Sequence, residues 1–432
     1  MTKAVRNAAR RAGIMGAALG AILVSMPLAA SAEQLTVWSG YPEMVPFYKH
    51  VAESMKADYP DLAVDVQAIP LRDHEKRVAL GLTSGSSGDV IELAVSTATR
   101  YMQNDLLEKA PADTIAYVDD TANFNTFFAD AGKLDGTLYG VPLFRGQGAL
   151  FYNTDMFKAA GLSEPPKTMD EYTDYAAKLA QRDGNGNLTV SGWSLRLSGG
   201  GQGIAEKFWI NMFQFGGNLL EEVADGKWKA AFANEAGHKT LAQYLDVVHG
   251  DKADSVAFPA DADAFERGQT AMFIRESWVI SDIATKAPDL NYATTTLPMG
   301  SIVAPVDMFV PAGSPKAELA WAFAKAATSP ENQLWLIENV GWLPNRSGLD
   351  YSALLAKTPQ FGAFVNYPDD YKFFTLPTIG PADELLTRIA AQLVNAFGDA
   401  SLQSNDAAID ATLQKTADEA NGILKREGLL AE

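Results

Sequence analysis

The sequence predicts an α/β fold with two domains, and three observations support this prediction. Strand-like and helix-like segments alternate from residue 35 to residue 95, which is typical of a parallel sheet with crossover helices. A chain of 432 residues can also bury a sizeable core, and it normally divides into two domains. Finally, the apolar, β-rich segment 138–153 contains Pro142. A proline has no N–H to donate, so we expect this strand to leave one sheet, turn and enter another.

The first half of the chain supplies the clearest run of elements. Residues 35–38 form a short strand, Pro42 stands where helices accept proline, and apolar residues follow at helical spacing to Tyr59. Two further strands, 62–68 and 89–95, are separated by a helix from about residue 72 to residue 83. Ligands of such sheets bind beyond the carboxyl ends of the strands. This rule points to residues 39–41 and 96–100.

The second half contains further predicted helices and strands. Thr168 to Glu171 form a capping box that opens a helix to Gln181. A serine cap at Ser329 with proline next to it begins another helix, which ends at Gly341. A second crossing between the domains is expected near 303–310, between Pro305 and Pro311. We also expect helices over about 204–215, 235–248, 383–397 and 407–426, and a short strand near 271–274.

The N-terminus has the order of a cleaved secretory signal. Four basic residues precede an apolar run from Ile14 to about Leu28, and Ala30-Ser31-Ala32 follows. We expect residues 1–32 to be removed, although a retained anchor is the alternative. This cleavage moves the net charge from −18 to −22, which disfavours nucleic acid and anionic lipid as partners. The chain has no cysteine, hence no disulfide, no thiol nucleophile and no lipoprotein anchor. We expect a protein free in the periplasm.

One long stretch carries a resemblance to a known family. Between residues 139 and 172 the chain reads YGVP, a short polar insert, LFYN, a helix ending AAGL, and PPKTMDEY. This order resembles the extracellular solute-binding proteins of bacterial ABC importers, in particular the sugar-binding group that includes maltose-binding protein. The stretch FERGQTAM with Trp278 after it, and GWLP at 341–344, match further family segments. The resemblance covers the mature chain nearly from end to end.

The resemblance implies a two-lobed periplasmic-binding-protein fold, in which each lobe is a mainly parallel sheet flanked by helices. Hinge crossings would join an N-terminal lobe, 33–142 plus 308–346, to a C-terminal lobe, 143–307 plus 347–432. Sugar clefts need flat aromatic faces and planar polar groups. The positions implied for ligand binding are Ser39, Gly40, Tyr41, Ser96, Arg145, Gln147, Gly200, Gln202, Trp278, Asp307, Trp342 and Arg346.

Each of these candidates has an ordinary structural alternative. An aromatic residue is more often core than cleft, and we assign Trp193 and Trp209 to the core. Arg145 and Gln147 would otherwise belong to a solvated hinge loop. The glycine run 199–203 is either a connector or a loop that offers N–H groups to an anion. If it binds, Arg145 or Arg346 would favour an acidic, sulfonated or phosphorylated glycoside.

No catalytic, metal or cofactor site emerges from the sequence. The four histidines lack metal-ligand spacing, and the loop GSSG at 85–88 is not a nucleophile elbow. The segment 183–187 begins like a calcium loop, but Leu188 and Ser194 replace the required glycine and glutamate, so a polar turn is favoured. A glycoside hydrolase would need two carboxylates across one cleft, and Glu92, Glu276 and Asp307 keep that alternative open.

The sequence therefore predicts a monomeric, non-enzymatic binding protein without cofactor or metal. It would capture a mono- or oligosaccharide or a charged glycoside by domain closure and deliver it to the membrane subunits of an ABC importer. The alternatives are a binding protein for a charged non-sugar solute and a secreted glycan-active enzyme.

Overall fold

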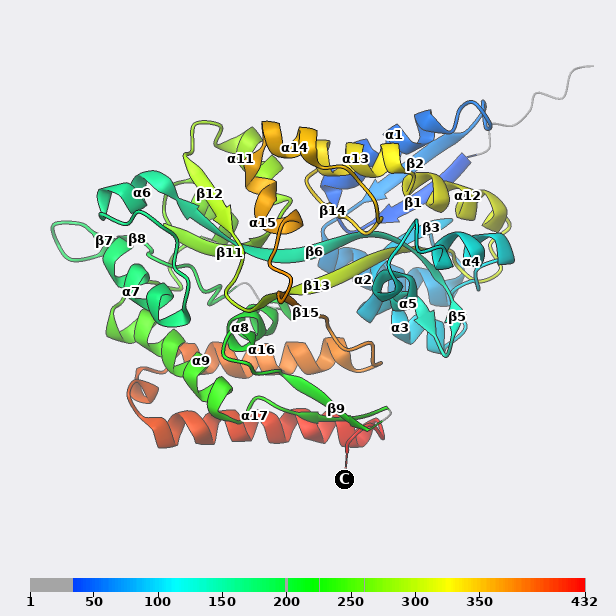
Figure 1. Cartoon of the computed structure of the whole chain (residues 1–432). Coiled ribbons are helices and arrows are strands. Elements are labelled where there is room, and N and C mark those ends of the chain that lie inside the picture. Colours follow the sequence, from blue (N-terminus) through cyan, green and yellow to red (C-terminus); the bar gives the residue numbers. More distant parts are fainter. Residues whose placement is uncertain (1–33, 199–200, 225, 260, 432) are drawn as a thin grey trace, which may run out of the picture.

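The structure is a computed structural model, and it describes residues 34–198, 201–224, 226–259 and 261–431. The expected signal peptide, residues 1–32, lies outside these ranges. Figure 1 shows two lobes joined by two long strands that run side by side, β6 (Gly140–Asn153) and β13 (Gly300–Phe309). The mixed α/β fold predicted from the sequence is confirmed.

The first lobe is built on a sheet in which three parallel strands lie next to the crossing strands. The strands β1 (Gln34–Ser39), β2 (Ala63–Ala68) and β3 (Val90–Ala94) pair in the order β2-β1-β3. The helices of this lobe are α1 (Val45–Ser54), α2 (Leu71–Ser84), α3 (Val95–Gln103), α4 (Ala112–Asp119), α5 (Thr126–Ala131), α12 (Ala317–Ala327) and α13 (Pro330–Asn339), with the small hairpin β4 (Lys133–Leu134) and β5 (Thr137–Leu138). The predicted strands and the proline-containing helix starts of this lobe are therefore confirmed.

The second lobe differs from the expected mainly parallel arrangement. Here β11 (Met272–Glu276) and β12 (Tyr292–Thr295) both pair with β6 in antiparallel orientation. Among the described strands of this lobe, β15 (Lys372–Phe374) pairs in parallel with β13, and isolated parallel bridges link Ser191 to Thr270 and Ser194 to Phe273. The reason is that β6 runs out of the first lobe, whereas β11 and β12 both run back towards it. The mainly parallel sheet is thus confined to the first lobe.

Helices surround the strands of the second lobe. They are α6 (Thr154–Ala159), α7 (Met169–Leu179), α8 (Gly203–Phe213), α9 (Glu235–Leu245), α10 (Asp261–Glu266), α11 (Val279–Lys286), α14 (Ser352–Lys357), α15 (Gly362–Val365), α16 (Ala382–Gly398) and α17 (Asp406–Arg426), with short strands β7 (Gln181–Arg182), β8 (Leu188–Val190), β9 (Leu220–Ala224) and β10 (Lys227–Ala230). The short strand β14 (Leu343–Pro344) pairs with β6 where that strand passes between the lobes. The capping box of α7 forms as predicted, with both of its hydrogen bonds present. In Figure 1, α16 and α17 pack against each other along the lower edge.

The expected turn at Pro142 does not occur. The strand β6 continues through Pro142, which lies opposite Asp307 of β13. A register shift between Val306 and Asp307 marks the same place. This irregularity accommodates a residue without an N–H, so a proline is tolerated inside a long strand. Two continuous strands therefore connect the lobes.

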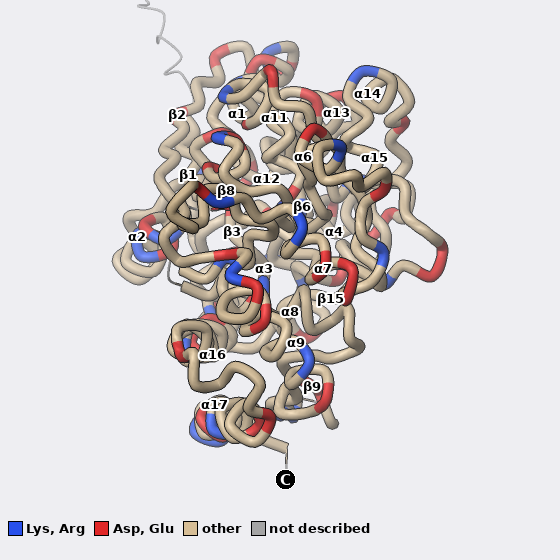
Figure 2. Tube along the Cα trace, turned by 90° about the vertical axis from the view of Figure 1, so that its left-hand side faces the viewer, with Lys and Arg blue, Asp and Glu red and all other residues tan. Residues whose placement is uncertain are grey.

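The core is divided into clusters that belong to different lobes. Leu143 and Phe144 of β6 pack in a first-lobe cluster, whereas Leu150 and Phe151 of the same strand pack in two second-lobe clusters. Trp193 and Trp209 are buried in the second lobe, as predicted. In Figure 2, basic and acidic positions are interspersed over both lobes. In the part of the chain that the structure describes, no helix combines the length and the apolarity that a membrane crossing requires.

Candidate functional site

A chamber of about 280 Å³ lies between the two lobes, beside the stretch in which β6 and β13 pass from one lobe to the other. We call it the central chamber. Its floor includes Gly146 of β6 and Ala304 of β13, and its walls come from both lobes. The lining residues are Tyr41, Glu43, Leu71, Arg72, Glu75, Ala94, Gly146, Arg196, Gln202, Gly203, Glu206, Lys207, Ile210, Arg275, Glu276, Trp278, Ile302, Ala304, Val306, Trp342 and Leu376.

An aromatic wall forms one side of the central chamber. The ring centroids of Tyr41 and Trp342 are 5.2 Å apart, and Trp278 approaches Trp342 at 6.4 Å from the other lobe. The indole Nε1 of Trp342 donates a 3.1 Å hydrogen bond to Glu43. Trp342 is buried, whereas Tyr41 and Trp278 are half-buried. The two half-buried rings offer faces on which an apolar ring surface can stack.

A buried carboxyl group holds the turn that carries Tyr41. Glu92 of β3 accepts hydrogen bonds from Ser39 Oγ at 2.9 Å and from the Gly40 N–H at 3.2 Å, and also from the hydroxyl of Tyr48. Ser39 Oγ in turn accepts from the Tyr41 N–H at 3.1 Å. Burial raises the pKa of Glu92 to about 8. This network fixes the direction in which Tyr41 leaves the sheet.

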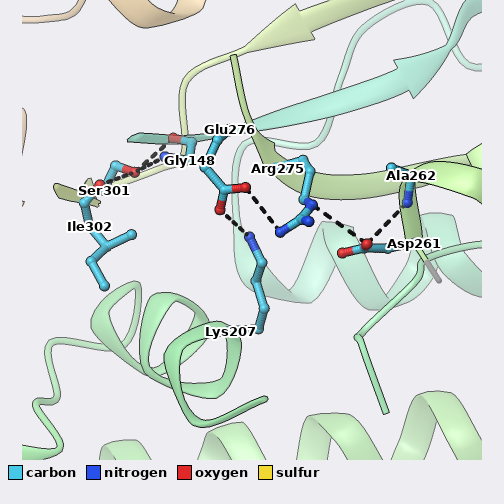
Figure 3. A network of polar contacts seen from close by, with 8 residues as sticks. All are labelled: Gly148, Lys207, Asp261, Ala262, Arg275, Glu276, Ser301 and Ile302. Atoms are coloured by element: carbon cyan, nitrogen blue, oxygen red, sulfur yellow. Dashed lines mark hydrogen bonds and ion pairs between the residues drawn. The ribbon is translucent and has the colours of Figure 1, made fainter. Parts of the chain in front are cut away.

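A chain of ionic contacts, drawn in Figure 3, adjoins the aromatic wall in the lining of the chamber, since the guanidinium carbon of Arg275 lies 5.4 Å from the ring centroid of Trp278. Glu276, at the end of β11, contacts Lys207 of α8 at 3.1 Å and Arg275 at 2.9 Å. Arg275 also lies 3.5 Å from Asp261. Burial alone would raise the pKa of Glu276, but Arg275 and Lys207 more than offset this effect and hold the pKa well below its usual range. Glu276 is therefore ionised, and the network offers planar donors and acceptors to ligand hydroxyls.

The crossing strands are tied together next to this network. Ser301 Oγ of β13 donates to the Gly148 carbonyl at 2.7 Å and accepts from the Gly148 N–H at 3.0 Å. A Cβ atom at Gly148 would lie 3.3 Å from this hydroxyl oxygen. A side chain at this point of β6 would crowd the hydroxyl group, so the contact favours a glycine here.

The structure brings four of the predicted residues together in the central chamber. These are Tyr41, Gln202, Trp278 and Trp342. Ser39 and Gly40 lie directly behind Tyr41 and support it through Glu92 rather than lining the chamber. Gly200 lies outside the described residues.

Arg145 and Gln147 point away from the chamber, which corrects their assignment to the ligand site. Side chains alternate along a strand, so Gly146 between them faces the chamber instead. Gln147 is fully buried, and its amide donates to the Phe364 carbonyl at 3.3 Å. Arg145 donates to the Pro344 carbonyl and to Gln147. Both side chains therefore stabilise the hinge side of β6.

Three further predicted residues also lie elsewhere. Asp307 is fully buried beneath Gly132 and Gly140, on the face of β13 opposite to Ala304 and Val306. Arg346 is held within the first lobe by the Thr328 carbonyl, Asn123 and Tyr117 at 2.7–2.9 Å. Ser96 lines a separate, mostly apolar cavity with Phe127 and Thr378. None of the three faces the central chamber.

Several residues of the chamber were missed by the sequence analysis. They are Glu43, Arg72, Glu75, Arg196, Glu206, Lys207 and Arg275. Charged residues are common on solvated helix faces, so the sequence does not distinguish the charged residues of the chamber from those of the surface. For Lys207, the neighbours Ala205, Phe208 and Trp209 are apolar, and a lysine within such a run is the one available signal.

The suspected calcium loop is a turn between β7 and β8. The Asp183 carboxylate accepts hydrogen bonds from the N–H groups of Asn185 and Asn187, each at 2.9 Å, and from the Asn187 side chain. Its oxygens are thus engaged by the turn itself. Elsewhere, too, the described ranges contain no group of three or more His, Asp or Glu residues placed to hold a metal ion.

Comparison with known proteins places this two-lobed chain. A family model described as bacterial extracellular solute-binding protein matches residues 50–363. The chain belongs to this family. Its members are non-catalytic solute-binding proteins of ABC transporters. A lactose-binding protein of Rhizobium radiobacter is 30% identical over 303 residues, which cover 66% of each chain.

Two solved structures illustrate the range of ligands on this fold. A solute-binding protein of Thermotoga lettingae with bound α-D-tagatose has a TM-score of 0.76 and 21% identity, and covers 90% of this chain and 99% of its own. UgpB of Mycobacterium tuberculosis, in complex with glycerophosphocholine, has a TM-score of 0.76 and 19% identity, and covers 91% and 99%. At these identities the comparison establishes the fold, and the solute of the present chain has to be argued from its own chamber.

Proposed function

We propose that this solute-binding protein captures a sugar or glycoside in the central chamber by domain closure and delivers it to the membrane subunits of an ABC importer. The observation that carries the proposal is the composition of the chamber, which combines an aromatic wall with an ionic network. The half-buried rings of Tyr41 and Trp278 suit the C–H faces of a pyranose. Lys207, Arg275 and Glu276 suit its hydroxyls.

Domain closure is supported by the fact that both lobes contribute residues to the wall of the chamber. Tyr41 and Arg72 come from the first lobe, and Lys207 and Trp278 come from the second. A ligand between them contacts both lobes only when these are together, so binding favours the closed form. The hinge would be formed by β6 and β13, which divide lobes of residues 33–142 plus 308–346 and 143–307 plus 347–432.

The relatives support a sugar as the solute. Lactose and tagatose are named for two proteins similar to this chain. We further propose that residues 1–32 are cleaved and that the mature protein acts as a monomer, free in the periplasm and without a lipid anchor. The N-terminal pattern and the absence of cysteine support this location.

A charged non-sugar solute is the second candidate. It is favoured by the number of ionisable residues in the chamber and by the glycerophosphocholine complex of a protein with the same fold. The two candidates differ in which part of the chamber dominates, because a sugar needs the aromatic wall and a small ion does not.

A thermal-shift screen of the mature protein tests the proposal. The panel contains neutral mono- and oligosaccharides, acidic glycosides and small charged solutes such as glycerophosphocholine. At a hundredfold excess over its Kd, a specific ligand adds roughly 2.7 kcal/mol of stability, and we expect this from a sugar or glycoside. Stabilisation by non-sugar solutes alone would overturn the proposal. Small-angle scattering of the best complex should show a smaller radius of gyration if the lobes close.

A further inference from the structure

Arg196 is turned into the central chamber by an unusual backbone. It has a φ of 54°, in the left-handed region that a non-glycine residue seldom occupies. Its neighbours Leu195 and Leu197 are buried in the second-lobe core, and the Leu195 N–H is bonded to the buried Asp254 carboxylate at 2.9 Å. The backbone on both sides is therefore anchored, and the arginine side chain is presented at the chamber wall.

Arg196 differs from the other cations of the chamber in its pairing. Arg72 contacts Glu75 at 2.9 Å, and Lys207 and Arg275 both contact Glu276. Within the described part of the chain, the guanidinium of Arg196 makes neither an ion pair within 4.0 Å nor a hydrogen bond. A half-buried guanidinium has lost part of its hydration and gains from an anionic partner.

A second guanidinium reaches the same place from the other lobe. A Cβ atom at Gly203 would lie 2.8 Å from Nη2 of Arg196, and a Cβ atom at Gly201 would lie 3.4 Å from Nε of Arg72. Two arginines from opposite lobes thus approach one three-residue segment, and each uses space left by a missing side chain. Both guanidinium groups therefore lie next to the start of α8.

Glu206, one turn further along α8, is the carboxyl group that faces both arginines. Burial raises its pKa and nearby Glu276 adds to this, while Arg196, Arg72 and Lys207 act in the opposite direction. Glu206 makes no ion pair within 4.0 Å among the described residues. It can therefore give up its charge by taking a proton when another anion arrives.

We propose that the solute carries an anionic group, a carboxylate, phosphate or sulfonate, that binds between Arg196 of the second lobe and Arg72 of the first. This inference rests on the proposed function, since it assigns a charge to the sugar or glycoside of the same chamber. A guanidinium presents parallel N–H donors that match the oxygens of all three groups. Because the two arginines belong to different lobes, the anionic group also bridges the lobes.

The test compares a neutral glycoside with its acidic analogues by calorimetry at pH 7. The probes are methyl α-glucoside and methyl α-galactoside, and for each the analogue with a carboxylate, phosphate or sulfonate at carbon 6. We expect at least one acidic analogue to bind tenfold or more tightly than its neutral parent, a difference of about 1.4 kcal/mol. Arg196→Gln should abolish this preference, and Arg388→Gln, an exposed arginine on α16, should leave it unchanged.

Glu206→Gln tests whether Glu206 takes part in anion binding or only stabilises the structure, because only the first role makes sulfonate affinity depend on pH. The charge of a sulfonate is constant between pH 5 and pH 8. In the wild type its affinity should rise as the pH falls, since Glu206 is protonated on binding, whereas Glu206→Gln should bind with a flatter pH profile.

Three results would overturn the inference. The first is tight binding of neutral sugars with no gain from an acidic group, which leaves the proposed function standing. The second is an equal loss of neutral and acidic ligands in Arg196→Gln. The third is failure of every sugar, neutral or acidic, both in this test and in the thermal-shift screen, and only this result also removes the proposed function.

Discussion

Nζ of Lys207 on α8 lies 3.1 Å from Oε1 of Glu276 on β11, and the two side chains are only 7% and 19% exposed. Glu276 also contacts Arg275 at 2.9 Å. A buried carboxylate thus holds together two cations from different elements, and it places both at the wall of the central chamber. The same contacts stabilise the lobe and prepare the site.

Removal of Lys207 should therefore reduce both stability and binding. Breaking a buried pair leaves an uncompensated charge, so Lys207→Met should lower the free energy of unfolding by about 3 kcal/mol. The control is Lys239→Met, since Lys239 pairs with Glu235 on the exposed face of α9 and should matter little. Urea unfolding followed by circular dichroism measures the free energy of unfolding of both variants. Equal effects in the two variants would contradict the buried role of Lys207.

The two tryptophans of the aromatic wall should separate ligand affinity from stability. Trp342 is 5% exposed and packs on Phe144 at 4.9 Å, so Trp342→Ala should cost about 3 kcal/mol of stability as well as affinity. Trp278 is half-buried. Trp278→Ala should lower sugar affinity about tenfold with a smaller loss of stability. Calorimetry and thermal unfolding of both variants measure the two effects, and retention of full affinity in Trp278→Ala would remove it from the site.

Asp307 should make the protein less stable as the pH rises. Its carboxyl group is fully buried, has no hydrogen-bond partner within the described chain, and burial raises its pKa to about 8. The unfolded chain releases this proton near pH 4. The folded state therefore binds more protons between about pH 4 and pH 8, and stability is lost over that interval.

Asp307→Asn should remove this part of the pH dependence. The amide is nearly the same size, so it fits beneath Gly132 and Gly140. We expect the variant to gain stability relative to the wild type as the pH increases from 5 to 8, in thermal unfolding at several pH values. Some pH dependence should remain because the pKa of Glu92 is also about 8. Parallel curves for wild type and variant would refute the assignment, and Asp370→Asn on the surface is the control.

Metal removal should leave the protein unchanged. The Asp183 carboxylate already accepts three hydrogen bonds from Asn185 and Asn187. Neither EDTA nor millimolar calcium is therefore expected to shift the midpoint of thermal unfolding. A clear rise with calcium, lost in Asp183→Asn, would show that this turn opens to bind the ion.

The sequence predicted the fold well because its signals are local. The capping box at Thr168 and the Ser329–Pro330 helix start both act within a few residues, and both form as expected. The candidate site was predicted less well, because it depends on which face of a strand meets the cleft. The sequence analysis assigns Arg145, Gln147 and Asp307 to the site. In the structure their neighbours Gly146 and Val306 face the chamber instead. Because side chains alternate along a strand, an error of one residue in the assigned position moves every side chain to the opposite face of the sheet.

The charged residues of the chamber could not be predicted from the sequence for a different reason. Arg72, Arg196 and Glu206 are far apart in sequence or lie in a loop, and their meeting depends on how the two lobes come together. Tyr41, Trp278 and Trp342 were found because each stands in a recognisable segment. Local pattern therefore located the aromatic wall, and only tertiary structure located the ionic groups.

The strand β6 supplies side chains to three separate hydrophobic clusters, with Phe144 in one lobe and Leu150 and Phe151 in the other. Neither lobe has a complete core without it. A fragment cut at the hinge would leave one half with an unfilled interior, so the lobes should melt together in one cooperative transition. Chimeras that exchange lobes between relatives would need to inherit β6 as one piece.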